Sequence, residues 1–340
     1  RNGPETILAF QASVRDGEPS GWNSNWGERL NFPHSGSHFG CCGFHQPSFN
    51  LVNFFQVDAA GLPLALAGPA WNAPVPDSNF AAGVVRPIDP RLDWTVGRDN
   101  VPYKDWGLHN RSWIRDVSFG GPYSPKKNVQ EQGADAENNV GWQATQTNDV
   151  PIHIFRYADA LLLLAEAEVE VGSLENARAI VNQIRARAGK VAQGCGRGAD
   201  ATSDSILKAT YPVCATDNRM SVPLVPNAGA TVDTLTTPWA VYRIGLYTTP
   251  WADQAFARTA VRYERRLELA MEGQRFFDLR RWGAADTTIT NYVASEKARI
   301  PYLTSAAPFT SRYVLYPIPS LQIELSRVGT QDMLQQNPGW

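Results

Sequence analysis

Aromatic and polar side chains gather most densely between residues 93 and 113. Trp and Tyr rings in such a stretch can stack on the apolar C–H faces of sugar rings, while amides, carboxylates and guanidinium groups bind hydroxyls. The same mixture can grip an extended peptide. The stretch contains Asp93, Trp94, Arg98, Asp99, Asn100, Tyr103, Lys104, Asp105, Trp106, His109, Asn110, Arg111 and Trp113.

This density predicts a ligand-binding surface in the surrounding loops. For any single Trp, the alternative is a hydrophobic anchor that holds a loop of little regular structure in place. The expected ligand contacts are Trp94, Arg98, Tyr103, Trp106, Trp113, Tyr123 and Trp71.

Two carboxylates one helical turn apart, Glu264 and Glu268, could be imagined as a catalytic pair, because glycosidases use two carboxylates. However, Arg265 and Arg266 adjoin them, and nearby cations lower the pKa of a carboxyl group instead of raising it for acid catalysis. The sequence also has no Gly-rich phosphate loop, Gly-x-Ser-x-Gly elbow or His-Glu-x-x-His motif. We therefore expect no enzyme. Ion pairs within and between helices are expected for Glu264, Arg265, Glu268, Glu272, Arg275, Asp278, Arg280 and Arg281.

The four cysteines form one adjacent pair and one separated pair. Cys41 and Cys42 can close only a small vicinal disulfide ring. Together with His34, His38 and His45 they could instead be drawn as a zinc site, but the Gly and Pro content and the lack of a C-x-x-C spacing favour a loop without metal.

Cys195 and Cys214 are expected to form a disulfide across a loop, which requires an oxidising compartment; two free thiols are the alternative. A structural calcium ion could bind oxygen ligands in a neighbouring loop, although a solvated loop is the simpler interpretation, and we predict no other cofactor. These oxygen ligands are Asp135, Glu137, Asn138 and Asn139.

The charge balance excludes one class of partner. The 340 residues carry 31 Lys and Arg against 33 Asp and Glu, which gives a net charge of -2. Nucleic-acid binders normally show a clustered basic excess, so none is expected here. No run reaches the roughly 18 apolar residues of a membrane-spanning helix. The length allows two or three structural units.

The chain divides into two regions of different composition. Residues 1–150 hold 29 of the 51 glycines and prolines and seven of the 11 tryptophans, and lack long amphipathic periodicity. They predict long loops with short helices and a few strands, such as Ile7 to Val14. Residues 151–340 are predicted to be helical, with a loop insertion over residues 190–250.

A helix hairpin is predicted at the start of the second region. Its first helix is lined by Ala158, Leu161, Leu162, Ala165 and Val169, and Gly172 ends it. Ser173 can cap the second helix, which is lined by Leu174, Ala177, Val181, Ile184 and Ala188.

This hairpin fits the roughly 34-residue tetratricopeptide template, but a lone unit cannot bury both of its faces. A further helical block is predicted from Asp253 to Met271, and Gly273 interrupts it before Phe276, Phe277, Leu279 and Trp282. One face of this block is predicted to carry Phe256, Ala260, Tyr263, Leu267 and Ala270.

Three blocks of sequence resemble the SusD/RagB family. They are RYADALLLLAEAE (156–168) with the following helix to Gly189, YERRLELAMEGQRFFDLRRWG (263–283), and the ending LYPIP (315–319) with QNPGW (336–340). Within the first region, GCCGFHQPS (40–48), DPRLDWTVG (89–97) and GPYSPKK (121–127) are similar to a subgroup of the family.

The resemblance implies a mostly α-helical fold, in which tetratricopeptide-like helix pairs pack against an irregular, loop-rich ligand-binding region. It further implies a non-enzymatic, lipid-anchored protein on the extracellular face of the outer membrane. Such a protein captures oligosaccharide or peptide nutrients and forms the lid of a SusC-like TonB-dependent barrel. The alternatives are a glycan-processing enzyme and a tetratricopeptide-type protein–protein scaffold.

The N-terminus departs from the family pattern. Family members begin with a signal peptide, a lipid-carrying Cys and several helices, whereas this sequence begins Arg-Asn-Gly-Pro. We therefore expect an N-terminally truncated member, or one whose N-terminal half is a separate chain.

Overall fold

The computed structural model describes residues 3–72, 87–104, 106–131, 147–189, 192–193, 221–222, 232–236 and 240–340. The chain forms two compact units, Arg1–Glu272 and Gly273–Trp340. This division differs from the compositional boundary predicted near residue 150. The reason lies in the first unit, where one hydrophobic core joins Phe54 and Leu92 of the loop-rich region to Tyr242 and Leu267 of the helical region.

The predicted helix hairpin is present as α3 (Tyr157–Val171) and α4 (Leu174–Gly189). Its predicted apolar face is buried, with Leu162, Ala165 and Val181 fully shielded from solvent. Gly172 ends α3, and the Ser173 hydroxyl accepts a hydrogen bond from the Asn176 N–H at 3.4 Å, as expected for a cap. The hairpin is thus positioned by the signals that its sequence carries.

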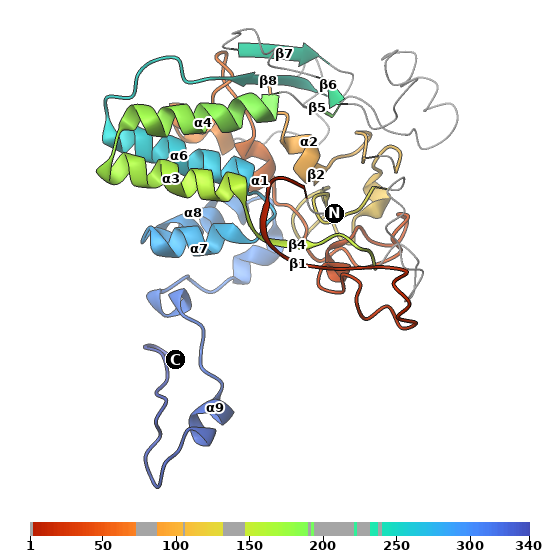
Figure 1. Cartoon of the computed structure of the whole chain (residues 1–340), viewed down its shortest axis with the longest axis vertical. Helices are drawn as coiled ribbons and strands as arrows, with labels where there is room; N and C mark the ends of the chain where they lie inside the picture. The colour runs from red at the N-terminus through yellow and green to blue at the C-terminus, as the bar shows by residue number, and fades with distance from the viewer. Residues whose placement is uncertain are drawn as a thin grey trace. The chain divides into compact units, whose positions relative to one another are not determined.

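A third helix, α6 (Gln254–Glu268), packs against both helices of the hairpin (Figure 1). Its N-terminus is capped by Asp253, whose carboxylate accepts from the Ala255 N–H at 2.9 Å. The predicted apolar face is partly wrong: Ala260 and Leu267 are buried, but Phe256 is 38% exposed. The buried face of α6 instead includes Glu264 and Glu268, because arginines from other elements neutralise them.

The strands of the first unit pair in twos within the described residues. β1 (Thr6–Phe10), at the site of the predicted strand, pairs antiparallel with β4 (Ile152–Arg156), so that Ala9 lies opposite His153. The predicted loop insertion contains a hairpin of β7 (Val232–Thr236) and β8 (Val241–Gly245). β8 belongs to the core, since alternate residues Tyr242 and Ile244 are fully buried.

Short elements make up the rest of the first unit where the structure describes it. Two further ribbons join β2 (Val96–Gly97) to β3 (Ser124–Pro125) and β5 (Ala192–Gln193) to β6 (Ser221–Val222). The helices are α1 (Phe49–Phe54) and α2 (Leu92–Thr95), with single 3-10 turns at Arg29–Asn31, Leu64–Ala67, Pro69–Asn72 and Arg111–Trp113. The loop-rich character predicted for the first region is therefore observed.

The second unit contains α7 (Gln274–Arg281), α8 (Ala285–Glu296) and α9 (Ser320–Leu325), with 3-10 turns at Pro301–Ser305 and Ser311–Val314. Its two closing motifs bind one another: the Gln336 amide hydrogen-bonds both the N–H and the carbonyl of Ile318, at 2.7 and 2.8 Å. The Trp340 indole N–H donates to the Arg312 carbonyl at 2.9 Å. Among the residues that the structure describes, no helix is both long enough and apolar enough to cross a membrane.

Candidate functional site

Three of the predicted ligand contacts form a buried aromatic core beneath the loops. Tyr103 is fully buried, and Trp106 and Trp113 are each 6% exposed. The Trp106 indole N–H donates to the Gln130 carbonyl at 2.8 Å, and the Tyr103 hydroxyl donates to the Pro125 carbonyl. The rest of this core is formed by Phe32, Phe39 and Val129. These rings pack together inside the first unit, which is the arrangement that the anchor alternative expects.

Arg98 and Tyr123 are also enclosed. The Arg98 guanidinium makes a bidentate ion pair with Asp93, with both N–O distances at 2.7 Å, and the Tyr242 hydroxyl donates to the same carboxylate at 2.5 Å. Lys126 donates to the Asp93 carbonyl at 2.5 Å, and burial lowers the pKa of its ammonium to about 7. Tyr123 is 1% exposed. These groups order the loop from inside.

Trp71 and Trp94 are the predicted contacts that reach the surface in part. Trp71 packs edge-to-face on Phe54 with ring centroids 5.2 Å apart, and the Arg266 guanidinium lies over both rings. Trp94 lines a cavity of about 340 Å³ whose other walls are mainly charged. Those walls are formed by Glu5, Arg91, Thr95, Lys127, Arg156, Arg187, Ala188, Glu268 and Glu272.

Ion pairs occupy the charged groups around this cavity. Glu268 accepts from Arg156 Nη1 at 2.8 Å, from Arg91 Nη1 at 3.1 Å and from Arg187. Burial raises the pKa of Glu268, but the charges of the three arginines outweigh that effect and hold the pKa well below its usual range. Glu264 is fully buried between Arg91, at 2.7 Å, and Arg185, at 2.9 Å.

The ion pairs expected within and between helices are therefore present. Arg265 pairs with Asp159 at 2.7 Å, and Arg266 donates to Asn50 at 2.5 Å. The cations that neutralise Glu264 and Glu268 come from distant segments, which local spacing does not reveal. Glu268, which its arginines hold in the ionised form, provides no carboxylic acid to protonate a leaving group.

Two exposed aromatic residues of the loop-rich part, Trp22 and Phe44, lie in the N-terminal loops. Trp22 is 75% exposed, and its ring centroid lies 6.5 Å from that of the half-buried Trp26. The Arg29 guanidinium lies over the Trp26 ring at 5.0 Å. An indole left this open to water on a loop is a feature of binding surfaces.

Carboxylates of the same loop fix the position of Trp22. The Glu18 carboxylate accepts from the backbone N–H of Trp22 at 2.6 Å and from that of Ser20 at 3.0 Å. Asp16 accepts from the Ser13 hydroxyl, the Asn23 amide and the Glu18 N–H, and these hydrogen bonds lower the pKa of its carboxyl group to about 2. The backbone of this loop is therefore fixed at Trp22.

The exposed row continues from Leu30 to Phe44 and Arg115. Leu30 is 54% and Phe44 58% exposed, and the Phe44 N–H donates to the Leu30 carbonyl at 3.1 Å. The Arg115 guanidinium stacks on the Phe44 ring at 4.2 Å. We call this row the N-terminal aromatic surface; it consists of Trp22, Trp26, Arg29, Leu30, Phe44 and Arg115.

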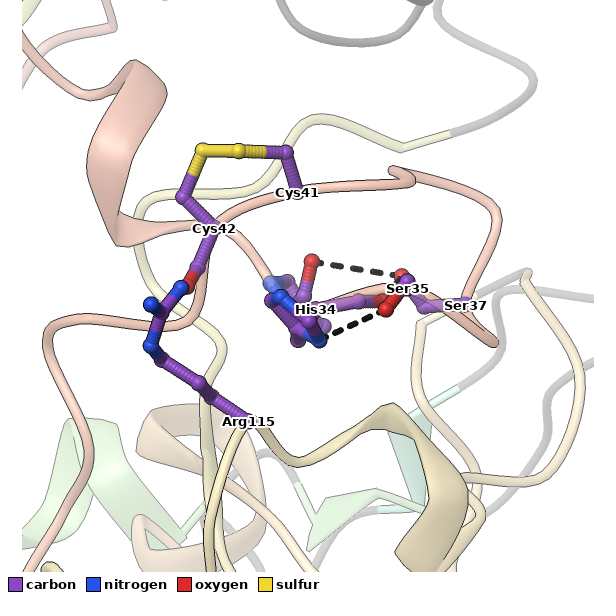
Figure 2. Close-up of a disulfide and its surroundings, with 7 residues drawn as sticks. His34, Ser35, Ser37, Cys41, Cys42 and Arg115 are labelled. Carbon is purple, nitrogen blue, oxygen red and sulfur yellow. Dashed lines mark hydrogen bonds between the residues drawn. A yellow bond between two sulfur atoms is a disulfide. The ribbon is translucent and has the colours of Figure 1, made fainter.

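Cys41 and Cys42 form a disulfide that supports one end of this surface (Figure 2). Figure 2 shows Arg115 extending toward Cys42, whose carbonyl accepts from Arg115 Nη1 at 3.0 Å. Ser35 and Ser37 hydrogen-bond the ring and the carbonyl of His34. The disulfide removes both thiolates as zinc ligands. Within the described ranges, no group of three His, Cys, Asp or Glu side chains is placed to hold a metal ion.

Several predicted residues lie outside the described residues. They are Cys195, Cys214, Asp135, Glu137, Asn138 and Asn139.

Sequence reasoning missed the N-terminal aromatic surface because it followed the density of aromatic residues. The signal that could have found it is weaker. Two tryptophans, Trp22 and Trp26, stand in a loop rich in Asp, Glu, Asn and Gly, where few apolar neighbours are available to bury them.

The fold and this surface define a class: a helix hairpin with a third packed helix, which carries irregular aromatic loops. The chain belongs to the SusD family, whose sequence pattern it matches over residues 4–340. No curated protein is detectably similar to it.

Among the solved structures that this chain resembles are three from Bacteroides. A SusD-like protein from Bacteroides fragilis NCTC 9343 is 18% identical, with a TM-score of 0.52, over 100% of this chain and 55% of that chain. A SusD homolog from Bacteroides thetaiotaomicron VPI-5482 is 21% identical, with a TM-score of 0.45, over 74% of this chain and 41% of that chain. Surface glycan-binding protein A from Bacteroides fluxus is 19% identical, with a TM-score of 0.42, over 99% of this chain and 51% of that chain.

The first of these likenesses supports the mostly helical SusD-like fold. The chain spans 41 to 55% of the length of these three solved structures.

Proposed function

We propose that this chain is the glycan-capturing part of a non-catalytic cell-surface binding protein. The observation that carries the proposal is the N-terminal aromatic surface on a chain of the SusD family. Its exposed rings can stack on the C–H faces of successive sugar units. Arg29 and Arg115 lie against the same row and can donate to hydroxyl groups. A row of this kind suits an extended oligosaccharide better than a compact ligand.

The arrangement of the carboxylates supports capture instead of hydrolysis. Glycosidases need one protonated and one ionised carboxyl group. Glu268 is held in its ionised form by arginines, and Glu264 lies between Arg91 and Arg185 without exposure to solvent. These groups connect helices and loops.

The partner and the location in the cell form the second part of the proposal and rest on the family alone. We infer that the protein acts at the extracellular face of the outer membrane, held there by a lipid anchor, as the lid of a SusC-like TonB-dependent barrel.

Binding to a glycan array tests the first part of the proposal. Wild-type protein, Trp22→Ala and the control Tyr316→Ala are applied to glycan and peptide arrays. Tyr316 suits the control because it is another exposed aromatic residue, at 67%, located in the second unit. We expect glycan binding that Trp22→Ala reduces and Tyr316→Ala preserves. Binding to peptides alone would show that the ligand is a peptide and not a glycan. Binding to neither array would contradict ligand capture by this protein.

Detergent extraction of the native protein tests the second part. A TonB-dependent barrel is expected to copurify with it. Recovery of the protein without any barrel would contradict the lid function but not glycan capture.

A further inference from the structure

The cavity beside Trp94, of about 340 Å³, is lined by three carboxylates that differ in their exposure to water. Glu268 and Glu272 are 4% and 21% exposed. Glu5, the residue that precedes β1, is 44% exposed. Glu5 is thus the carboxylate of this cavity that is most open to solvent.

The Glu5 carboxylate spans two arginines, with one oxygen on each. Its Oε1 accepts from Arg187 Nη1 at 2.9 Å, and its Oε2 lies 3.5 Å from Arg156 Nη1. The Arg187 side chain is 44% exposed, like Glu5, while Arg156 is 13% exposed. The two guanidinium groups therefore form a carboxylate-binding pair that a molecule from solvent can approach on the side of Arg187.

The contacts of Glu5 are the easiest of this network to break. An ion pair between exposed side chains contributes little, because water screens the charges and two long side chains lose entropy. Glu268, in contrast, is buried among three arginines, and breaking buried pairs is strongly unfavourable. The Glu5 carbonyl accepts from the Tyr157 N–H at 2.7 Å, so the backbone is held while the side chain can turn out of the cavity.

The charge of the cavity favours an anion in place of Glu5. Arg91 is paired with Asp89, which lies outside the cavity, at 2.7 Å. Without Glu5, the other charged groups of the wall are three cations and two carboxylates: Lys127, Arg156 and Arg187 against Glu268 and Glu272. The difference is one positive charge, which an entering carboxylate neutralises and a cation would increase.

The remaining wall limits the size and polarity of the ligand. Trp94 and Ala188 line the same cavity and provide an apolar surface for a short carbon chain. The volume is at the lower end of the range for ligand pockets. Guanidinium groups bind carboxylates through strong, charge-assisted hydrogen bonds. A small molecule with a carboxylate at one end and an apolar chain therefore matches this cavity.

We propose that this cavity binds a short organic carboxylate anion, and that the Glu5 side chain occupies the position of the ligand carboxylate in the free protein. The ligand displaces Glu5 from Arg156 and Arg187 and packs its carbon chain against Trp94. Glu5 is thus a competitor built into the chain. The site is separate from the N-terminal aromatic surface and goes beyond the function proposed above.

Saturation-transfer NMR with butyrate tests the proposal, and butyramide is the neutral control probe. Glu5→Gln keeps the shape of the side chain and removes the competing charge. Glu170→Gln is the matched control, because Glu170 is 47% exposed and also pairs with an arginine, Arg258. We expect saturable butyrate binding that is about 2- to 5-fold tighter in Glu5→Gln than in the wild type or Glu170→Gln, and none of butyramide.

Arg187→Gln removes one of the two cations that hold the carboxylate. It should weaken butyrate binding about 10-fold or more, as the loss of a charge-assisted hydrogen bond predicts, while the control Arg258→Gln binds as the wild type does. Circular dichroism verifies that the variants fold; if Arg187→Gln does not, the comparison of Glu5→Gln with Glu170→Gln decides alone.

Three results overturn the proposal. They are no saturable butyrate binding by the wild type and Glu5→Gln, equal binding of butyrate and butyramide, and equal butyrate affinity in the wild type and Glu5→Gln. Trp22→Ala should bind butyrate as the wild type does, so failure of this proposal leaves glycan capture at the N-terminal aromatic surface unaffected.

Discussion

Replacement of Glu268 by Gln removes the central charge of the network that joins the loops to the helices. Arg91 comes from the loop-rich region, Arg156 from β4 and Arg187 from α4, and all three contact this one carboxylate on α6. The amide keeps the shape of the side chain but loses the charge and can accept on one oxygen only. Arg156 and Arg91 then lose part of their neutralisation in a buried setting.

The structure sets the expected magnitude. The Glu268 side chain is 4% exposed, so solvent screens its ion pairs little. Breaking a buried ion pair by removing one partner costs about 3–5 kcal/mol, because the remaining charge is left without compensation. A domain is stable by only about 5–15 kcal/mol in total. Glu268→Gln should therefore lower the midpoint of urea unfolding by a large fraction.

Equilibrium unfolding in urea, followed by circular dichroism, measures this effect. Glu170→Gln is the matched control, because Glu170 on α3 also pairs with an arginine of α6, Arg258, at 2.6 Å. That pair is 34% and 47% exposed, so its loss should cost no more than about 1 kcal/mol. If Glu268→Gln proves as mild as the control, the reasoning about the buried network is refuted.

Two further predictions concern the core and acid stability. Trp113→Ala should lower the free energy of unfolding by about 3–5 kcal/mol, because it empties a buried aromatic site. The variant that does fold should bind glycan as tightly as the wild type. A loss of glycan affinity in fully folded Trp113→Ala would place Trp113 on the binding surface. The pKa values of Asp89, Glu268 and Glu272 are all lowered by neighbouring cations against the opposing effect of burial. Their stabilisation is complete above the pKa of an unfolded carboxyl group, about 4, and is lost as pH falls through the lower folded values. The melting temperature should therefore decrease as the pH is lowered below about 4, and this decrease should be less steep in Glu268→Gln. A melting temperature that does not change between pH 5 and 2 would contradict the stabilising role of these carboxylates.

The sequence predicts the helix hairpin well because local signals determine it. Apolar spacing places Leu162 and Val181 on the buried faces, and Gly172 and Ser173 mark the turn between the helices. The same logic fails on α6, where the buried face includes Glu264 and Glu268. Apolar periodicity cannot reveal a buried carboxylate whose partners lie up to 177 residues away.

The candidate site was harder to predict, for a related reason. Tyr103, Trp106 and Trp113 have the composition of a binding surface, yet they pack on Phe32 and Phe39 from a distant loop. Whether an aromatic ring is core or surface depends on such long-range contacts. The Glu18 carboxylate holds the backbone of Trp22, while the Trp22 side chain is 75% exposed.

Isothermal titration of wild type and Trp22→Ala with the oligosaccharide bound most strongly on the array tests the central claim directly. Loss of an exposed aromatic anchor is expected to weaken binding by about 1–3 kcal/mol, or roughly 5- to 150-fold in Kd. Tyr316→Ala should bind as the wild type does. Equal affinities for the wild type and Trp22→Ala would contradict capture at the N-terminal aromatic surface.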